Sequence, residues 1–415
     1  MSAARALGKR YARAALVLAS PRSRAPTRPQ ALIGDPNVNT PTFSNVRYGM
    51  IGCGMMGQEH LRNIALLPGA RVTRIFEPDE AMVAKSLALA SGAQRASSLA
   101  EVVSAADVDC LVVASPNFCH ADQLREIAAL RPLPVLLEKP ACTTLDDVHE
   151  LAALGQRYPA PIWVAMEYRY MPPVALLGEA VHSERDTGRA LMLSIREHRF
   201  PFLVKVNDWN RFNRYSGGTL VEKCCHFFDL MRHLTRSEPV RIYASAGVDH
   251  NHLNERYADG TPDILDNAYV VVDFASGQRA MLELCMFAEG ARYQEEISVV
   301  GPKGKIECFV PGPGRFWPAD LGPAPVPKVV ISPRDPKGPR ELDVPVDPVA
   351  LAAGDHNGST LYQHQRFNAV VRGQGEVEVG LRDGLAAVLM GLAAQESART
   401  GSAISLTAGA FALQH

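Results

Sequence analysis

The 415-residue chain has no long apolar run, almost no net charge and no regular spacing of its cysteines. No segment approaches the roughly 18 uninterrupted apolar residues that a membrane helix needs, so we predict a soluble protein with no membrane partner. The formal net charge of -1 gives no electrostatic reason to bind nucleic acid. The eight cysteines include no C-x-x-C pair, which argues against a disulfide framework or a metal site and favours a reducing compartment.

Residues 1–45 also lack acidic side chains until Asp35, although seven basic residues precede it. This composition is typical of an organelle transit peptide, which would direct the protein to a mitochondrion or plastid. A disordered extension, or an upstream start codon in a cytoplasmic protein, would give the same composition. The segment is excluded from the predicted fold in each case.

The rest of the chain has the composition of a soluble globular protein, with 47% apolar and 21% charged residues over its whole length. Its length is sufficient for two domains with filled cores. We place the first domain at residues 46–170 and the second at residues 171–415.

The first domain begins with an apolar run, residues 46–51, followed at once by a G-x-G-x-x-G sequence and a helical pattern. Strand, glycine-rich turn and helix in this order are the context that dinucleotide binding requires. Gly52 permits the tight turn, Gly54 lets the backbone approach a pyrophosphate, and Gly57 allows close packing of helix on strand. The phosphates would lie over the helix N-terminus, where free N–H groups favour negative charge.

A second predicted strand, residues 71–76, ends in Glu77, 20 residues after Gly57. An acidic side chain there can accept hydrogen bonds from the adenosine ribose and would repel a 2′-phosphate. We therefore predict NAD as the cofactor rather than NADP. A solvated carboxylate at a strand end is the alternative interpretation of Glu77.

Apolar strands then alternate with helices as far as residue 137, which predicts a parallel sheet covered on both faces. Two segments fall at the carboxyl ends of these strands, where such sheets bind ligands: Ser-Pro-Asn-Phe-Cys-His at 115–120 and Glu-Lys-Pro at 138–140. Turn formation alone would explain the first segment. The second places a lysine beside the cofactor cleft.

The order and spacing of G-x-G-x-x-G, an acidic strand end, S-P-N-x-x-H and E-K-P resemble the Gfo/Idh/MocA family of oxidoreductases. The resemblance extends from about residue 46 to residue 406. It implies that Lys139 lies beside the nicotinamide and the substrate hydroxyl, and that a cis peptide bond precedes Pro140. Together with the glycine-rich turn, it predicts these cofactor-binding residues: Gly52, Gly54, Met55, Met56, Gly57, Glu77, Ser115, Asn117, His120, Glu138, Lys139 and Pro140.

The second domain shows strands of alternating polarity joined by short turns, with helices between some of them. The whole chain is thus predicted to be an α/β Rossmann-like parallel sheet domain followed by an α+β domain with a large, mostly antiparallel open sheet. Residues 311–348 carry eleven prolines, so we predict no regular element there and expect a surface excursion or lid, with the proline-rich excursion placed at 311–357. The last helix, residues 383–399, is expected to pack on the first domain.

A helical pattern after Gly217 and Gly218 carries Glu222 and His226 four residues apart, hence on one face. A carboxylate stacked on an imidazole fixes the ring and raises its basicity, as proton transfer near neutral pH requires. Such a pair is also common on helix surfaces. The segment is similar to the family's G-G-G-x-L-x-D-x-G-x-H, whose Asp and His are catalytic, although Glu222 replaces the Asp and Cys224 a glycine. We predict Lys139, Glu222 and His226 as catalytic and assign no role to Lys223.

Aromatic and arginine side chains cluster before this helix, and aromatic faces with hydrogen-bonding groups suit a polyhydroxylated ring. The predicted substrate residues are Tyr168, Arg169, Trp209, Arg211 and His226. Ordinary surface arginines are the alternative. His356, in a glycine-flanked loop, is a further possible contact.

These residues predict an NAD-dependent dehydrogenase of sugars, inositols or related polyols, in which Lys139 and His226 share removal of the hydroxyl proton. Two other functions fit the same resemblance: a glycosidase that keeps NAD bound and uses transient oxidation, and a non-catalytic NAD-sensing protein. The resemblance further implies a homodimer or homotetramer that forms through the second-domain sheet.

Overall fold

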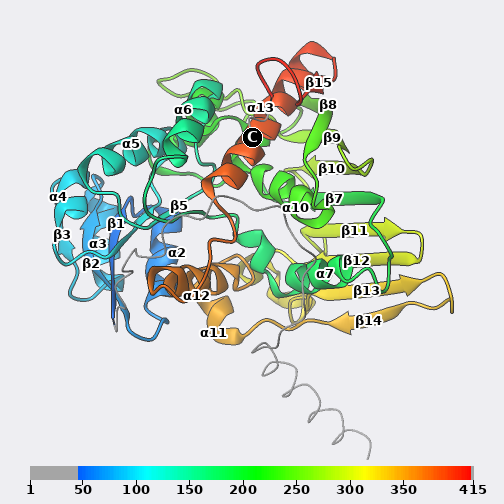
Figure 1. The fold of residues 1–415 in the computed structure, drawn as a ribbon, viewed down its shortest axis with the longest axis horizontal. Coiled ribbons are helices and arrows are strands. Elements are labelled where there is room, and N and C mark those ends of the chain that lie inside the picture. The colour runs from blue at the N-terminus through cyan, green and yellow to red at the C-terminus, as the bar shows by residue number, and fades with distance from the viewer. Residues whose placement is uncertain (1–44, 413–415) are drawn as a thin grey trace, which may run out of the picture. The chain divides into compact units, whose positions relative to one another are not determined.

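The computed structural model describes residues 45–412, and these residues contain two sheets with their helices (Figure 1). Of the predicted extension at residues 1–45, all but Asn45 lies outside the described residues. Among the described helices, none is long and apolar enough to cross a membrane.

The first sheet has six parallel strands in the order β3-β2-β1-β4-β5-β6. Its strands are β1 (Val46–Ile51), β2 (Ala70–Phe76), β3 (Gln94–Arg95), β4 (Cys110–Val113), β5 (Val135–Leu137) and β6 (Ile162–Val164). The helices that connect them are α2 (Met55–Ile64), α3 (Glu80–Leu89), α4 (Leu99–Ser104), α5 (His120–Leu130) and α6 (Leu145–Gly155). Every residue of β4 and β5 is buried, as expected for central strands covered on both faces.

Parallel strands bring their carboxyl ends to one edge of the sheet. The glycine-rich turn follows β1 and the Glu138–Lys139 pair follows β5. Glu167 begins a short 3-10 helix, Glu167–Tyr170, just after β6. Three chain segments thus converge at the edge where such sheets bind ligands.

The second sheet has nine strands in the order β14-β13-β12-β11-β7-β10-β9-β8-β15 within the described residues. They are β7 (Met192–His198), β8 (Pro239–Gly247), β9 (Asn267–Phe274), β10 (Arg279–Cys285), β11 (Glu295–Gly301), β12 (Gly304–Val310), β13 (Lys328–Pro333), β14 (Arg340–Asp343) and β15 (Ile404–Ser405). Only β7 and β10 pair in parallel, and the other neighbours are antiparallel. The predicted fold class is confirmed.

Helices cover one face of this sheet, while strand residues on the other face alternate outward, as the pattern of buried and exposed positions in β9 shows. The helices after residue 170 are α7 (Pro172–His182), α8 (Asn213–Ser216), α9 (Thr219–Glu222), α10 (Cys225–Thr235), α11 (Pro348–Ala353), α12 (Ser359–Val371) and α13 (Leu381–Thr400). A short 3-10 segment, Val206–Arg211, precedes α8.

The proline-rich segment is more ordered than predicted. It contains β13, β14 and α11, and β13 pairs along its length with β12. The prediction of no regular element is therefore wrong. Its prolines lie at the ends of these strands: Pro327 precedes β13 and Pro333 is its last residue, while Pro339 and Pro345 lie on either side of β14, so few ladder hydrogen bonds are lost.

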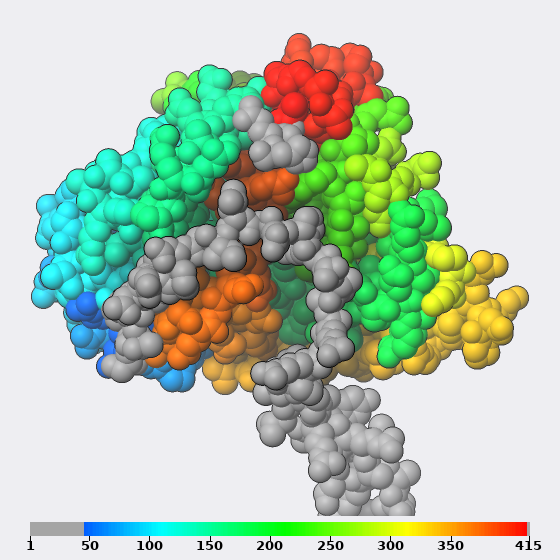
Figure 2. All heavy atoms as spheres, in the orientation of Figure 1, coloured from blue at the N-terminus to red at the C-terminus, as the bar shows by residue number. Residues whose placement is uncertain are grey.

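Two C-terminal helices bind the sheets together. Helix α12 packs against α2, and Figure 2 shows its orange side chains next to blue residues of the first domain. Helix α13 contacts α6 of the first domain and α9, α10 and β8 of the second. Two of its glycines allow this close approach, because a Cβ on Gly384 would lie 2.7 Å from the Val164 side chain and one on Gly391 would lie 2.5 Å from the Leu220 carbonyl oxygen.

Candidate active site

In the turn between β1 and α2, two of the three glycines are closely packed against backbone atoms and the third faces open space. Gly52 has φ +81°, and a Cβ there would lie 2.4 Å from the Ser115 backbone nitrogen. A Cβ on Gly57 would lie 2.5 Å from the Gly52 carbonyl oxygen. A Cβ on Gly54, in contrast, meets no atom of the described chain within 4 Å. The open space therefore lies in front of Gly54, where the fingerprint places a pyrophosphate.

Helix α2 presents its N-terminus to this space. Its N-cap, Gly54, contributes no capping side chain, and no acidic residue occupies the first turn of this described helix. The first N–H groups and the positive end of the helix dipole are thus available to an anion. The residues present fit a dinucleotide, which Gly54, Met55 and Met56 would hold.

Glu77 supports the turn from the end of β2. Its Oε2 accepts a hydrogen bond from the Cys53 backbone N–H at 2.6 Å, and its Oε1 accepts one from the Asp79 N–H at 2.9 Å. The side chain is nearly buried. These bonds fix a negative charge next to the glycine-rich turn.

The loop after β4 is held by its polar residues. The two ring nitrogens of His120 lie 2.7 Å from the Pro140 carbonyl oxygen and 3.0 Å from that of Ser115. Asn117 donates through Nδ2 to the Ser216 carbonyl at 3.1 Å. His120 therefore ties the loop after β4 to the loop at Pro140, and Asn117 ties it to Ser216 at the end of α8. A direct cofactor contact by either residue stays a prediction.

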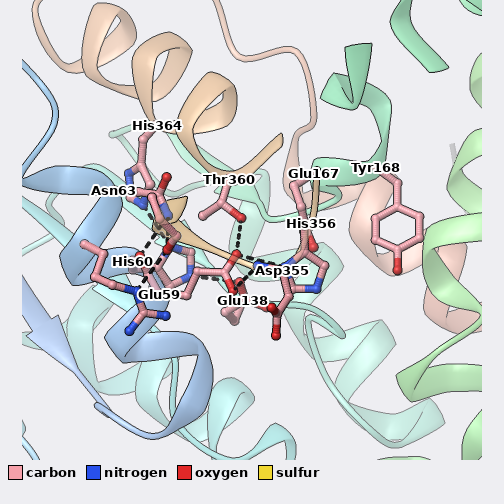
Figure 3. Close-up of polar contacts among 12 residues, drawn as sticks. Glu59, His60, Asn63, Glu138, Glu167, Tyr168, Asp355, His356, Thr360 and His364 are labelled. Atoms are coloured by element: carbon pink, nitrogen blue, oxygen red, sulfur yellow. Dashed lines mark hydrogen bonds and ion pairs between the residues drawn. The ribbon is translucent and has the colours of Figure 1, made fainter. Parts of the chain in front are cut away.

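The E-K-P segment has the cis bond before Pro140 that the resemblance implied. Glu138 is buried, and its Oε1 lies 2.8 Å from His60 Nε2, while His60 Nδ1 lies 2.8 Å from His364 Nε2 (Figure 3). Burial raises the pKa of Glu138, but the hydrogen bond and charge of His60 outweigh it and the pKa is lowered. Glu138 also accepts the Lys139 backbone N–H at 3.1 Å, so this chain of contacts fixes the backbone of Lys139.

The Lys139 ammonium reaches across to the second domain. Its Nζ donates to the Glu222 carbonyl oxygen at 3.0 Å. Burial lowers the pKa of Lys139, but the opposing effects of Cys225, Glu222 and Glu138 prevail and the pKa is raised. Lys139 is therefore charged at neutral pH.

His226 lies in the same pocket and has the opposite character. Its ring stacks on Tyr168 with 4.1 Å between centroids and 8° between planes. Burial, then the charges of Lys139 and Lys223, lower the pKa of His226 well below its ordinary value. Its Nδ1 has no hydrogen-bond partner among the described residues. His226 is therefore a neutral imidazole with a free ring nitrogen.

The predicted Glu222–His226 stack is wrong. The helix breaks between the two residues: α9 ends at Glu222 and α10 begins at Cys225. Glu222 instead pairs through Oε1 with Lys205 Nζ at 3.3 Å. At the break, the Glu222 carbonyl accepts the Lys139 ammonium, a contact to the other domain that the helical pattern cannot predict.

The pocket that contains Lys139, Glu222 and His226 includes two of the five predicted substrate residues, Tyr168 and His226. The other three are engaged elsewhere. Arg169 forms a bidentate pair with Asp229, at 2.6 and 2.5 Å. Arg211 pairs with Glu255 at 2.9 Å, and the Trp209 ring lies under Lys205. Their role as substrate contacts is not supported by this geometry.

Comparison with known proteins identifies the chain's family. Residues 46–166 match the NAD-binding Rossmann fold of the Gfo/Idh/MocA oxidoreductases, and residues 183–406 match their C-terminal alpha/beta domain. The chain belongs to the Gfo/Idh/MocA oxidoreductase family. The predicted recognition, the NAD-binding domain and the oxidoreductase class are thereby confirmed.

Similar members of the Gfo/Idh/MocA family include the rhizopine catabolism protein MocA of Rhizobium meliloti, 27% identical over 289 residues, which are 67% of this chain and 81% of that protein. Inositol 2-dehydrogenase 2 of Saccharopolyspora erythraea is 30% identical over 265 residues, 63% of this chain and 73% of that protein. The structure of levoglucosan dehydrogenase with NADH and levoglucosan superimposes with a TM-score of 0.72 at 19% identity, over 87% of this chain and 99% of that one. At that identity it supports the fold alone.

The family motif did not point to several charged residues that line the pocket. Besides residues already described, these are Glu59, Glu167, Arg199, Lys205, Lys223, Glu295, Arg315, Asp355 and His356. Most lie on separate elements and meet only in the folded chain, so their order in the sequence gives little signal. His356, noted as a possible contact, is among them.

His356 crosses from the second domain to helix α2, where its Nδ1 lies 2.9 Å from Glu59 Oε1 (Figure 3). Thr360 donates to the same oxygen at 2.8 Å. Burial opposes both shifts, but the pair lowers the pKa of Glu59 to about 2 and raises that of His356 to about 9. His356 is therefore an imidazolium in the pocket wall at neutral pH.

Lys223, left unassigned in the sequence, is a positioning residue in this Gfo/Idh/MocA site. Its Nζ lies 2.6 Å from the Tyr168 hydroxyl and 2.8 Å from Glu197 Oε1. Burial lowers the pKa of Lys223 against the opposing charge of Glu197. Because Tyr168 stacks on His226, Lys223 holds the ring that supports the His226 imidazole.

Proposed function

We propose that the chain is an NAD-dependent oxidoreductase that moves a hydride between nicotinamide and a hydroxyl-bearing carbon of a sugar, inositol or related polyol. The observation that supports this proposal best is the convergence of Lys139 and His226, from different domains, in one pocket that Met55 and Met56 of the glycine-rich turn also line. Family membership and the named substrates of relatives agree with it.

The two catalytic residues have different protonation states and therefore different roles in the proposed reaction. His226 is neutral, and its Nε2, which lies 3.7 Å from Glu167 Oε1, accepts the substrate hydroxyl proton. Lys139, an ammonium, stabilises negative charge that develops on the substrate oxygen. When bound, NAD supplies the hydride acceptor. In the reverse direction His226 returns the proton to the oxygen.

Glu77 supports NAD over NADP in this proposal. Its carboxylate is fixed at the end of β2 by two backbone N–H groups, so it cannot swing away from an adenosine ribose placed there. Its charge would repel a 2′-phosphate.

We also propose a homodimer or homotetramer that associates through the open face of the second sheet. Tyr243, Val271 and Met281 sit opposite one another on β8, β9 and β10, and each is more than a third exposed. Tyr269 and Met192 add to this surface, at 58% and 61% exposed. A contiguous apolar patch of this kind is typical of an association surface.

The test combines a substrate screen with two substitutions. Inositols, aldoses and their oxo forms are assayed by NADH absorbance with NAD and with NADP. His226→Ala and Lys139→Met should each lower kcat about 10²- to 10⁴-fold, since general acid–base help has that magnitude. NAD binding, measured by calorimetry, should survive both changes.

The matched control is Lys85→Met, an exposed lysine on α3, which should leave kcat unchanged. Undiminished kcat in either active-site variant would contradict the proposed roles. Cleavage of a glycoside without net NADH formation would instead indicate the NAD-retaining glycosidase.

A further inference from the structure

Several hydrogen-bond acceptors in the pocket lining have no donor among the described residues. Among the buried polar atoms of its lining that have no partner in the described structure, the oxygens all belong to carboxylates: both of Glu167, Oε2 of Glu222 and Oε2 of Glu295. A buried polar group without a partner is costly, so these oxygens are expected to be satisfied by a ligand.

The cations of the pocket already have protein partners. Lys139 binds the Glu222 carbonyl and Lys205 its carboxylate. The remaining cation contacts are Lys223 with Glu197, Arg199 with Glu197, Arg315 with Asp355, and His356 with Glu59. The unpaired carboxylate oxygens of the pocket would therefore accept hydrogen bonds from donor groups on a ligand, and they do not favour an anionic ligand group.

Glu167 is the unpaired acceptor that lies next to His226. Its Oε1 lies 3.7 Å from His226 Nε2, which is too long for a hydrogen bond. Its electrostatic neighbours include Lys139, His356 and Glu138, and Figure 3 shows it beside His356. The side chain is 1% exposed. Burial first, and then Glu138, raise the pKa of Glu167 to about 7.

We propose that Glu167 accepts a hydrogen bond from the substrate group on the carbon next to the oxidised one, so that the enzyme selects vicinal diols and vicinal amino alcohols. This inference rests on the proposed function. His226 would deprotonate one substrate hydroxyl, and Glu167 would accept a hydrogen bond from the donor group on the adjacent carbon. The 3.7 Å between His226 Nε2 and Glu167 Oε1 allows the two substrate groups to lie side by side.

The same geometry disfavours a carboxylate or phosphate at that neighbouring carbon. Such a group would face Glu167, and like charges placed together in a buried site oppose binding. A hydroxyl and an ammonium both supply the required donor, and the test includes one probe of each kind.

The test compares wild type with Glu167→Gln on myo-inositol, on a set of monodeoxy inositols and on an amino-deoxy inositol. For wild type, kcat/KM should fall about 10- to 100-fold when the substrate lacks the hydroxyl on the carbon adjacent to the oxidised one, because the buried Glu167 carboxylate is then left without a hydrogen-bond donor. Glu167→Gln should show a much smaller loss. The substitution Glu167→Gln should lower kcat/KM for the amino-deoxy inositol more than kcat/KM for myo-inositol. Only the ammonium group depends on the negative charge of the carboxylate.

Glu296→Gln is the matched control, a carboxylate on β11 of the second sheet that pairs with Arg196. It should keep the wild-type ratio. The melting temperature of Glu167→Gln should not fall, because the amide is of similar size and no partner is removed.

The outcomes separate the two proposals. A wild type that oxidises these compounds, with the same deoxy penalty in Glu167→Gln, would overturn the role of Glu167 and leave the proposed function standing. A wild type that neither oxidises nor, by calorimetry with NAD, binds any of these compounds or any sugar or polyol of the substrate screen would overturn both.

Discussion

Three buried glutamates, Glu59 and Glu167 in the pocket and Glu138 outside its lining, show that the partner, rather than the residue type, decides the charge. Glu59 bonds to His356 and Thr360 and its pKa is lowered to about 2. Glu167 has no hydrogen-bond partner among the described residues, and burial raises its pKa to about 7. Glu138 is as deeply buried, but His60 lowers its pKa. Glu59 and Glu138 thus stay ionised near neutral pH, whereas Glu167 can gain or lose a proton there.

The Glu59–His356 pair makes stability depend on pH. The pKa of His356 is raised from 6.5 to about 9, so its contribution is complete below about pH 6.5 and is lost as pH rises through 9. The pKa of Glu59 is lowered from 4.5 to about 2, so its contribution is present above about pH 4.5 and is lost as pH falls toward 2.

His356→Gln should therefore lower the free energy of unfolding most near pH 6 and much less at pH 9.5. Urea unfolding of both proteins at the two pH values measures this difference. A difference that does not change with pH would show that the pair contributes nothing through its charge.

At the glycine-rich turn, Gly54→Ala should weaken NAD binding without destabilising the protein. The added methyl group meets no described atom and Gly54 has φ −65°, so folding tolerates alanine, but the methyl would point into the space proposed for the pyrophosphate. We expect the Kd for NAD to rise at least about 10-fold, the cost of losing a charge-assisted hydrogen bond, with an unchanged melting temperature of the free protein.

Gly290→Ala is the matched control for this change, because its Cβ also meets open space but in a loop of the second domain. It should alter neither quantity. Unchanged NAD affinity in Gly54→Ala would argue against the proposed phosphate position.

At the scale of elements, the break between α9 and α10 is the feature that builds the site. A continuous helix would use the Glu222 carbonyl in its own ladder and present Glu222 beside His226. The break frees that carbonyl for the Lys139 ammonium and turns the Glu222 carboxylate toward Lys205. The Lys139 ammonium of one domain is thus tied to the backbone of the other.

Helix α13 holds this break in place through Gly391. A Cβ there would lie 2.5 Å from the Leu220 carbonyl oxygen and 2.9 Å from the Val221 Cα, both in α9, so the backbone would have to move. Gly391→Ala should cost about 1–3 kcal/mol in the free energy of unfolding, as overpacking does. It should also lower kcat, because α9 carries the carbonyl that binds Lys139.

Chemical unfolding and steady-state kinetics check the two expectations for Gly391→Ala separately. A variant as stable and as active as wild type would show that α13 adapts, and that the approach of the two elements does not control the site.

At the scale of the whole molecule, the second sheet has one face covered by helices and one face open within the described residues. The open face carries the row Tyr243, Val271 and Met281 across three neighbouring strands. The proposed oligomer would cover this row and remove it from water.

Val271→Glu should dissociate the proposed oligomer, because it places a charge in the middle of an apolar interface. Size-exclusion chromatography with light scattering should show a smaller species than wild type. Ala84→Glu, which adds the same charge on the exposed face of α3, should leave the size unchanged. A wild type that is monomeric at micromolar concentration would contradict the proposal.

Local patterns were enough to predict the nucleotide-binding half of the protein. The strand-turn-helix order, the three glycines and the E-K-P segment are contiguous, and a parallel strand order follows from their alternation with helices. The prediction failed for β13 and β14 because it used only the number of prolines in the segment. The prolines lie at or beside the ends of these strands, where they do not prevent strand pairing.

The amino-acid sequence by itself determined the family and the two-sheet architecture, and it singled out Lys139 and His226 as the proposed catalytic pair, because each depends on neighbouring residues along the chain. Only the tertiary structure decided the protonation states and the contact partners of these groups. Glu167, Lys223 and the Glu59–His356 pair reach the pocket from elements far apart in sequence, and burial acts on their charges only after those elements pack.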